Sequence, residues 1–172
     1  KKEVLMLVDG SAIVHRAYHA MPPLTTPDGT PTGAIHGFFA MLLKLILQLK
    51  PSYVVVAFDR AKPTFRQQLY VGYQVQRPKM ESDLSSQYQA IIEILKKAKI
   101  QEIGVDGFEA DDVIGTLSER ANKEGILTYI VTGDRDMLQL VDQDTLVLMP
   151  VKGISEVKLH DEESVKASYN VD

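Results

Sequence analysis

The chain contains, at residues 107–115, the segment Gly107-Phe108-Glu109-Ala110-Asp111-Asp112-Val113-Ile114-Gly115. It places three carboxylates within four residues, where a helix is expected to begin. One acid at such a position caps the helix or interacts favourably with its dipole. Three acids so close together raise one another's proton affinity unless a cation lies between them. A divalent metal such as Mg²⁺ or Mn²⁺, which prefers oxygen ligands, is the simplest explanation, and a solvated acidic helix start is the alternative.

Three apolar runs elsewhere in the chain also end at acidic residues. Asp9 follows residues 4–8, Asp59 follows residues 54–58, and Asp134 and Asp136 follow residues 128–133. Each run is typical of a buried strand. The carboxyl ends of parallel strands share one edge of a sheet, where open α/β proteins place their ligand and catalytic sites. We therefore expect seven carboxylates around one crevice, and that many acids indicate two metal ions. The seven are Asp9, Asp59, Glu109, Asp111, Asp112, Asp134 and Asp136.

Composition narrows the class of protein. A length of 172 residues, 45% of them hydrophobic, predicts one domain with a sizeable core. The absence of cysteine excludes a disulfide framework and cysteine-ligated zinc or iron–sulfur sites. No apolar run reaches the length of a membrane span, and Lys1-Lys2 before a strand is not a secretory signal. We expect a cytoplasmic protein with no membrane partner.

The net charge of −4 argues at first against a nucleic-acid partner. Of the 23 acidic residues, however, seven belong to the predicted crevice, which leaves 16 against 19 Lys and Arg. If metal ions neutralise the crevice, the rest of the surface is mildly basic. A polyanionic substrate is then allowed.

Apolar patterning predicts alternating strands and helices. We expect strands at residues 3–9, 53–58, 100–103, 126–131 and 145–149, with 155–159 as a hairpin partner after Gly153. We expect helices at residues 12–20, 34–49, 83–98 (capped by Ser82 or Asp83), 109–123, 134–141 and 161–169, and a loop at 22–33. This alternation favours one α/β domain over residues 1–172, a three-layer sandwich around a mostly parallel sheet.

Residues 60–82 form an insertion of different character. Basic residues stand there among aromatic ones, with few acids. Such a mixture resembles a single-strand grip, in which rings stack on bases and cations meet phosphates, and a solvated basic loop is the alternative. Its place directly after Asp59 favours function, because loops at the carboxyl edge carry sites. The residues concerned are Arg60, Lys62, Phe65, Arg66, Tyr70, Tyr73, Arg77 and Lys79.

The sequence lacks the motifs of several other classes of enzyme. The sequence has no Gly-x-Ser-x-Gly elbow, no Gly-x-x-x-x-Gly-Lys loop and no Gly-x-Gly-x-x-Gly, which disfavours acyl transfer and nucleotide binding of those kinds. The four histidines lack zinc-ligand spacing. Phosphodiester cleavage by two carboxylate-held metals fits strand-end acids beside a basic and aromatic loop.

Six segments carry the most distinctive residues: Leu7–Ser11, Thr32–Phe38, Ala57–Asp59, Thr64–Arg66, Gly107–Gly115 and Thr132–Leu140. In this order they resemble the 5′-nuclease domain at the amino end of bacterial DNA polymerase I, in the flap-endonuclease group with a PIN-like fold. The resemblance implies a 5′-3′ exonuclease or flap endonuclease that acts, in DNA replication and repair, on DNA with a 5′ single-stranded end or flap. It also implies Mg²⁺ or Mn²⁺ as cofactor, a nucleoid-associated location and fusion to a polymerase in the full-length protein.

The resemblance also implies roles for particular residues. The first metal would be held by Asp9, Asp59, Glu109 and Asp111, with Asp112 beside it, and the second by Asp134 and Asp136. Residues 60–82 would form part of an arch that a 5′ single strand threads, with Arg66, Tyr73, Gln74 and Arg77 contacting nucleic acid.

Two departures from the family pattern keep other functions open. Gln74 stands where the arch signature Tyr-Lys-x-x-Arg has lysine, and the helix–hairpin–helix segment that grips the duplex does not occur in residues 1–172. A nucleic-acid-binding module with weak or no catalysis is therefore the alternative. A small-molecule phosphatase of the haloacid-dehalogenase type is disfavoured, because Asp9-Gly10-Ser11 lacks the second acid of Asp-x-Asp.

Overall fold

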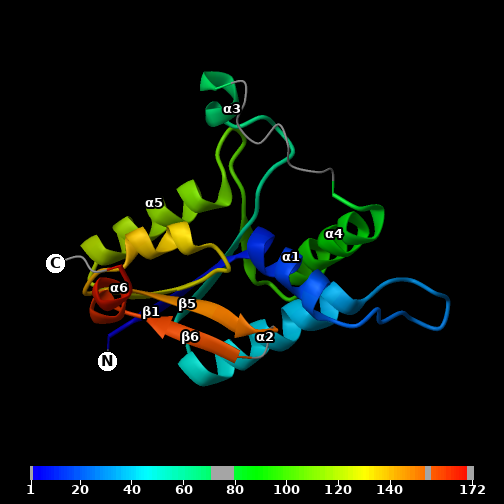
Figure 1. Cartoon of the computed structure of the whole chain (residues 1–172), viewed down its shortest axis with the longest axis horizontal. Helices are drawn as coiled ribbons and strands as arrows, with labels where there is room; N and C mark the ends of the chain where they lie inside the picture. The colour runs from blue at the N-terminus through cyan, green and yellow to red at the C-terminus, as the bar shows by residue number, and fades with distance from the viewer. Residues whose placement is uncertain (1, 71–79, 154–155, 170–172) are drawn as a thin grey trace.

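The computed structural model describes residues 2–70, 80–153 and 156–169, which form a layered α/β structure (Figure 1). A six-stranded sheet has the order β3-β2-β1-β4-β5-β6. The strands are β1 (Val4–Asp9), β2 (Tyr53–Ala57), β3 (Gln101–Ile103), β4 (Leu127–Val131), β5 (Thr145–Lys152) and β6 (Glu156–His160). The helices are α1 (Gly10–Ala20), α2 (Gly33–Leu49), α3 (Phe65–Leu69), α4 (Ser82–Lys97), α5 (Ala110–Lys123), the 3₁₀-helix η1 (Arg135–Leu140) and α6 (Glu162–Tyr169).

The first five strands are parallel, and β6 pairs antiparallel with β5. The turn between β5 and β6 passes through Gly153, whose φ of 59° lies in the left-handed region that favours glycine. The predicted hairpin and the mostly parallel sheet are both confirmed.

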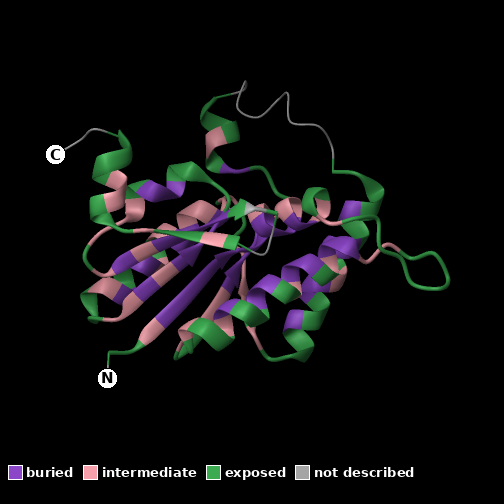
Figure 2. Ribbon diagram, turned by 60° about the horizontal axis from the view of Figure 1, so that its bottom comes forward, coloured by how far each residue is buried: buried purple, intermediate pink, exposed green. Residues whose placement is uncertain are grey.

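Helices cover both faces of the sheet, which makes the three layers expected from the sequence. On one face α1, α2 and α4 pack on Met6 and Val8 of β1. On the other face α5 and η1 pack on Leu5 and Leu7. The alternation along β1 follows from the two-residue period of a strand, and the strand is apolar on both sides because both are covered. Figure 2 shows buried residues running along the central strands between the helices.

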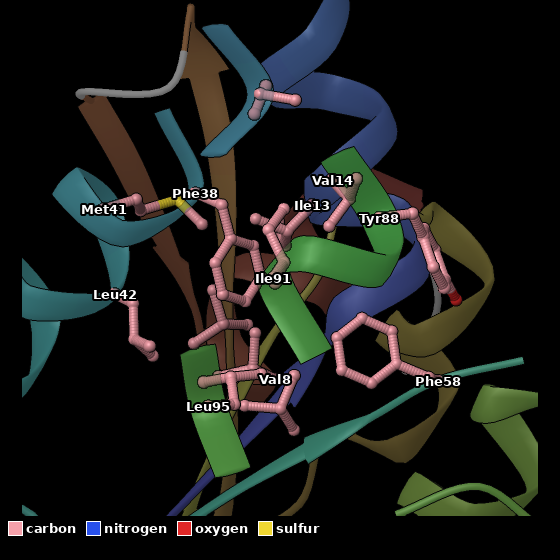
Figure 3. Close-up of a cluster of buried hydrophobic side chains, with 14 of the residues drawn as sticks. Val8, Ile13, Val14, Phe38, Met41, Leu42, Phe58, Tyr88, Ile91 and Leu95 are labelled. Atoms are coloured by element: carbon pink, nitrogen blue, oxygen red, sulfur yellow. The ribbon is translucent and has the colours of Figure 1, made fainter. Parts of the chain in front are cut away.

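The larger core lies between α1, α2, α4 and the sheet (Figure 3). Phe38, Phe58, Ile91 and Leu95 are almost completely buried in it. Phe58 directly precedes an expected site residue, and a Cβ built on Gly10 would come within 2.5 Å of its ring. Glycine at position 10 therefore lets the turn after β1 close onto the end of β2.

The sheet has a topological switch point at β1. The chain proceeds from β1 to β2 and β3 on one side, and then crosses over to β4 and β5 on the other. Adjacent crossovers that leave in opposite directions open a crevice at the carboxyl ends of the two strands between them, here β1 and β4. Asp9 ends β1, and Asp134 follows β4 closely.

The predicted elements differ from those in the structure by one to three residues at their ends, and in one case by helix type. The segment predicted as a helix at 134–141 is a 3₁₀-helix, and α1 begins at Gly10 rather than residue 12, because Asp9 accepts a hydrogen bond from Ala12 N–H and caps it. The helix predicted to be capped by Ser82 or Asp83 has Glu81 at its N-cap instead. The Glu81 carboxylate accepts a hydrogen bond from Tyr18 Oη (2.8 Å), a tertiary contact that local propensity does not reveal. Among the described residues, no helix is long and apolar enough to cross a membrane.

Candidate active site

A pocket of about 320 Å³ lies at the carboxyl edge of the sheet, at the switch point. We call it the acidic pocket. Six of the seven predicted carboxylates line it: Asp9, Asp59, Glu109, Asp111, Asp134 and Asp136. These residues come from the ends of β1, β2 and β4 and from the amino end of α5, so the fold brings together acids up to 127 positions apart in the sequence.

Asp9 is the most buried of the six, with 3% of its surface exposed. Its Oδ1 accepts a hydrogen bond from Ala12 N–H (2.9 Å), and its Oδ2 accepts one from Thr132 Oγ1 (2.8 Å). The pKa of Asp9 is raised to about 6, mainly by burial and to a smaller extent by the charges of Asp59 and Asp134, against the lowering effect of these two hydrogen bonds. The carboxylate is thus fixed in position but costly to ionise without a nearby cation.

Asp59 is held by backbone contacts from two elements. Its Oδ1 accepts a hydrogen bond from Ala110 N–H (2.8 Å) at the start of α5, and its own N–H donates to Ser11 Oγ (2.9 Å). Ser11 Oγ is also 2.9 Å from Tyr88 Oη, with which it shares a hydrogen bond. Ser11 and Tyr88 are buried and were given no role from the sequence, although Ser11 stands two residues after Asp9 in a quoted motif. Ser11 contacts Asp59 directly and Tyr88 contacts Ser11, and both contacts depend on tertiary packing.

Asp111 lies among the other carboxylates. Its pKa is raised to about 7, first by burial and then by the charges of Asp9, Asp134, Asp59 and Glu109. Four neighbouring acids therefore act on one side chain at the start of α5. A cation in the pocket would favour the ionised forms of all of them.

Asp134 and Asp136 belong to the first turn of η1. The Asp134 carboxylate accepts a hydrogen bond from Asp136 N–H (2.9 Å), and Asp134 N–H donates to Thr132 Oγ1 (3.0 Å). Thr132 therefore binds both Asp9 and the backbone of Asp134 and joins the ends of β1 and β4. Both aspartates are exposed, unlike Asp9.

Asp112, predicted to lie beside the first metal, does not line the acidic pocket itself. It lines the neighbouring cavity beside α5, together with Glu109, Asp111 and Asp136. Arg66 of α3 donates two hydrogen bonds to Asp112, each 2.7 Å long. Asp112 Oδ2 also accepts a hydrogen bond from Glu109 N–H (3.0 Å). The guanidinium, which lowers the pKa of Asp112, also lies 3.5 Å from Glu109 Oε2. The structure thus gives Arg66 and Asp112 a shared role in joining α3 to α5.

The remaining predicted arch residues, Tyr73, Gln74 and Arg77, lie outside the described residues. Of the insertion at 60–82, the structure describes residues 60–70 and 80–82. Arg60 and Lys62 line the acidic pocket, where they pair with Glu102 (3.3 Å) and Asp106 (2.6 Å), respectively.

The donors in the pocket fit a divalent metal in their chemistry, because six carboxylates supply oxygen ligands and two of them have a raised pKa. Among the described residues, no three acidic or histidine side chains are already arranged to surround an ion. Mg²⁺ tolerates such a site, since it keeps several water ligands and takes one or two carboxylates together with substrate phosphates. Mg²⁺ binding at this site therefore does not require that protein side chains alone complete its coordination shell.

Comparison with known sequences gives a consistent result. A family model described as the 5′-3′ exonuclease, N-terminal resolvase-like domain, matches residues 4–170. The chain is 44% identical over 149 residues to a 5′-3′ exonuclease of Aquifex aeolicus, a match that covers 87% of this chain and 52% of the relative. It is 40% identical over 172 residues to DNA polymerase I of Mycobacterium leprae, which covers 99% of this chain and 19% of the polymerase. The chain thus spans about half of one relative and about a fifth of the other.

Solved structures share the fold. The flap endonuclease D15 of bacteriophage T5, in a complex with DNA and metal ions, matches with a TM-score of 0.75 and 17% identity over 99% of this chain and 62% of that chain. The catalytic core of Rad2, in complex with a DNA substrate, matches with a TM-score of 0.54 and 23% identity over 99% of this chain and 51% of that one. The expected PIN-like architecture is confirmed.

Proposed function

Because the chain belongs to the family of 5′-3′ exonuclease N-terminal resolvase-like domains, we propose that it is the catalytic core of a metal-dependent 5′-nuclease that hydrolyses DNA phosphodiesters. The observation that carries this proposal is the acidic pocket, where six carboxylates meet at the switch point of the sheet. A protein selected for stability alone would gain nothing from acids that raise one another's pKa. The substrate would be DNA with a 5′ single-stranded end or flap, and the protein would work in the cytoplasm, at the nucleoid.

The carboxylates divide by position. Asp9, Asp59, Glu109 and Asp111 would hold a first ion, and Asp134 and Asp136 a second. When bound, two Mg²⁺ or Mn²⁺ ions supply an activated water and stabilise the attacking and leaving oxygens of the phosphodiester. Thr132 orients Asp9 through its hydroxyl, and Ser11 fixes the backbone of Asp59.

Asp112 and Arg66 have a different part in this proposal. Their bidentate pair attaches α3, the described start of the insertion, to the helix that carries Asp111. The insertion would in this way be held over the acidic pocket, close to the path of a single strand. DNA contacts by Tyr73, Gln74 and Arg77 remain part of the proposal.

A cleavage assay on a labelled 5′-flap substrate, with Mg²⁺, Mn²⁺ or EDTA, tests the proposal. We expect metal-dependent hydrolysis that Asp111→Asn lowers by orders of magnitude. Glu93→Gln, which removes an exposed acid of α4 away from the acidic pocket, is the control and should retain activity. Flap binding without cleavage at any metal concentration would instead favour a nucleic-acid-binding module.

A further inference from the structure

A second cavity, of about 480 Å³, lies where the middle of α1, the start of η1, the β5–β6 hairpin and the end of α6 meet. Four basic side chains line it, and we call it the cationic pocket: Arg16, Arg135, Lys158 and His160. None of the described residues that line it is acidic. This is a marked local excess of positive charge in a chain whose net charge is −4.

The side chains of this pocket are arranged by the fold. Arg16 donates hydrogen bonds to Gly153 O (3.0 Å) and Val151 O (3.5 Å), so its guanidinium is fixed against the hairpin. Arg135 and Lys158 are exposed, and among the described residues no carboxylate forms an ion pair with either of them. Both cations are therefore available to an anion from solution.

His160 adds an unsatisfied polar group to the same place. Its Nδ1 is buried and has no hydrogen-bond partner within the described part of the chain. Burial lowers its pKa, and the charges of Lys158 and Arg135 lower it further, whereas Asp161 opposes them. The Asp161 carboxylate accepts a hydrogen bond from Ser164 N–H (2.9 Å) at the start of α6. The field at His160 is thus dominated by cations.

A shallow cavity connects the cationic pocket with the acidic pocket. It shares Ala12 and Asp134 with the acidic pocket, and Arg16 and Arg135 with the cationic pocket. The two pockets are therefore neighbours along one continuous surface on the α1 side of the switch point.

The other neighbour of the acidic pocket has the opposite character. A cavity of about 670 Å³ beside α5 shares Glu109, Asp111 and Asp136 with the acidic pocket. It is lined by further acids, and its one described cation, Arg66, is paired with Asp112. A polyanion that leaves the acidic pocket is repelled on this side and attracted on the side of α1.

We propose that the cationic pocket binds a phosphate group of the nucleic-acid strand whose reacting phosphodiester lies in the acidic pocket. The identity of the polyanion rests on the proposed function, whereas the affinity for phosphate rests on Arg16, Arg135 and Lys158. Arg135 stands between the two aspartates of η1, so the same short element serves both pockets. The pocket thereby sets the direction in which the strand leaves the site of reaction.

Binding of a labelled single-stranded oligonucleotide, measured by fluorescence anisotropy in EDTA over a series of salt concentrations, tests this proposal. Lys158→Gln should weaken binding and make the slope of log K against log salt shallower by about 0.7, the value for one phosphate contact on a single strand. Lys158→Arg should retain both. Lys97→Gln makes the same change in net charge at an exposed residue that lines none of these cavities, and it should match the unaltered protein.

Strands with a 5′-hydroxyl and with a 5′-phosphate distinguish the source of the phosphate. An effect of Lys158→Gln on both strands indicates an internal phosphodiester, and an effect only on the phosphorylated strand indicates the terminal group. Equal affinities and slopes for Lys158→Gln and Lys97→Gln would overturn the proposal. Because EDTA prevents metal-dependent cleavage, this experiment measures binding alone. Its result therefore does not depend on whether the protein cleaves DNA in the nuclease assay.

Discussion

Asp111 is the side chain in the acidic pocket whose ionisation is opposed by both burial and the neighbouring carboxylates. Burial and the charges of four neighbouring acids together raise its pKa to about 7. A carboxyl whose pKa is higher in the folded state than in the unfolded state does not destabilise the protein at low pH, because it is protonated in both states. The free energy of unfolding then falls as the pH rises from about 4 to about 7, because Asp111 ionises in the unfolded chain before it ionises in the folded protein.

Asp111→Asn should therefore stabilise the metal-free protein above pH 7 and have little effect near pH 3. Melting temperatures in EDTA across this range measure it. Asp161→Asn is the control with the opposite sign, because hydrogen bonds from Ser164 lower the pKa of Asp161, and its loss should not stabilise the protein at neutral pH. A metal-free Asp111→Asn protein that melts well below the unaltered one at pH 8 would show that the acid has a structural role.

Thr132 connects Asp9 and Asp134 through its hydroxyl group. Its hydroxyl donates to Asp9 in a buried hydrogen bond and accepts from Asp134 N–H in a partly buried one. Thr132→Val keeps the shape but leaves these groups unsatisfied, which should cost about 1–3 kcal/mol of unfolding free energy. It should also weaken Mn²⁺ binding, because Asp9 loses a fixed orientation. Thr132→Ser retains the hydroxyl and should restore most of both properties in denaturation and titration experiments.

Individual site residues were predictable from the sequence to different degrees. Asp9 and Asp59 follow apolar strands, and strand polarity alone places them at one edge of the sheet. Asp112 has the same local sequence context as Asp111, yet it faces Arg66, 46 positions earlier. Spacing along α5 could not separate the two, because the difference arises from the packing of another element. The roles of Ser11 and Thr132 depend in the same way on partners distant in sequence.

Among the elements, the attachment of α3 to α5 depends on the Arg66–Asp112 pair. The bidentate geometry and partial burial of both side chains, 32% and 23% exposed, make it stronger than an ordinary surface pair. A double-mutant cycle with Arg66→Gln and Asp112→Asn, followed by chemical denaturation, should give a coupling energy of about 1–3 kcal/mol. The Lys123–Glu119 pair, with both side chains 70% exposed, should couple by no more than about 0.5 kcal/mol. Similar coupling in the two pairs would contradict a structural role for Arg66.

The order and type of the elements were largely predictable. Strands that are apolar on both faces, such as β1 and β4, indicate a parallel sheet covered on both sides, and this is confirmed. The 3₁₀ geometry of η1 was not predictable, because six residues of either helix type have nearly the same pattern. The start of α4 was also missed, since the N-cap is Glu81, whose side chain does not cap the helix but accepts a hydrogen bond from Tyr18 of α1.

At the scale of the whole molecule, charge is separated across the switch point. The acidic pocket and the cavity beside α5 collect negative charge, while the cationic pocket collects positive charge on the side of α1. The net charge of −4 conceals this separation, which is a property of the fold rather than of composition. A chain that binds a polyanion and divalent metals side by side needs both regions.

Calorimetric titration of the protein with Mn²⁺ measures whether the acidic pocket binds divalent metal. We predict saturable binding of about one ion per chain, because Asp9, Asp59, Glu109 and Asp111 supply the first site, with a weaker second site at the exposed Asp134 and Asp136. Asp111→Asn should weaken the first site strongly, whereas Glu93→Gln, at an exposed residue of α4, should leave it unchanged. Absence of saturable binding, or a first site that is insensitive to Asp111→Asn, would show that the acidic pocket is not a metal-binding site.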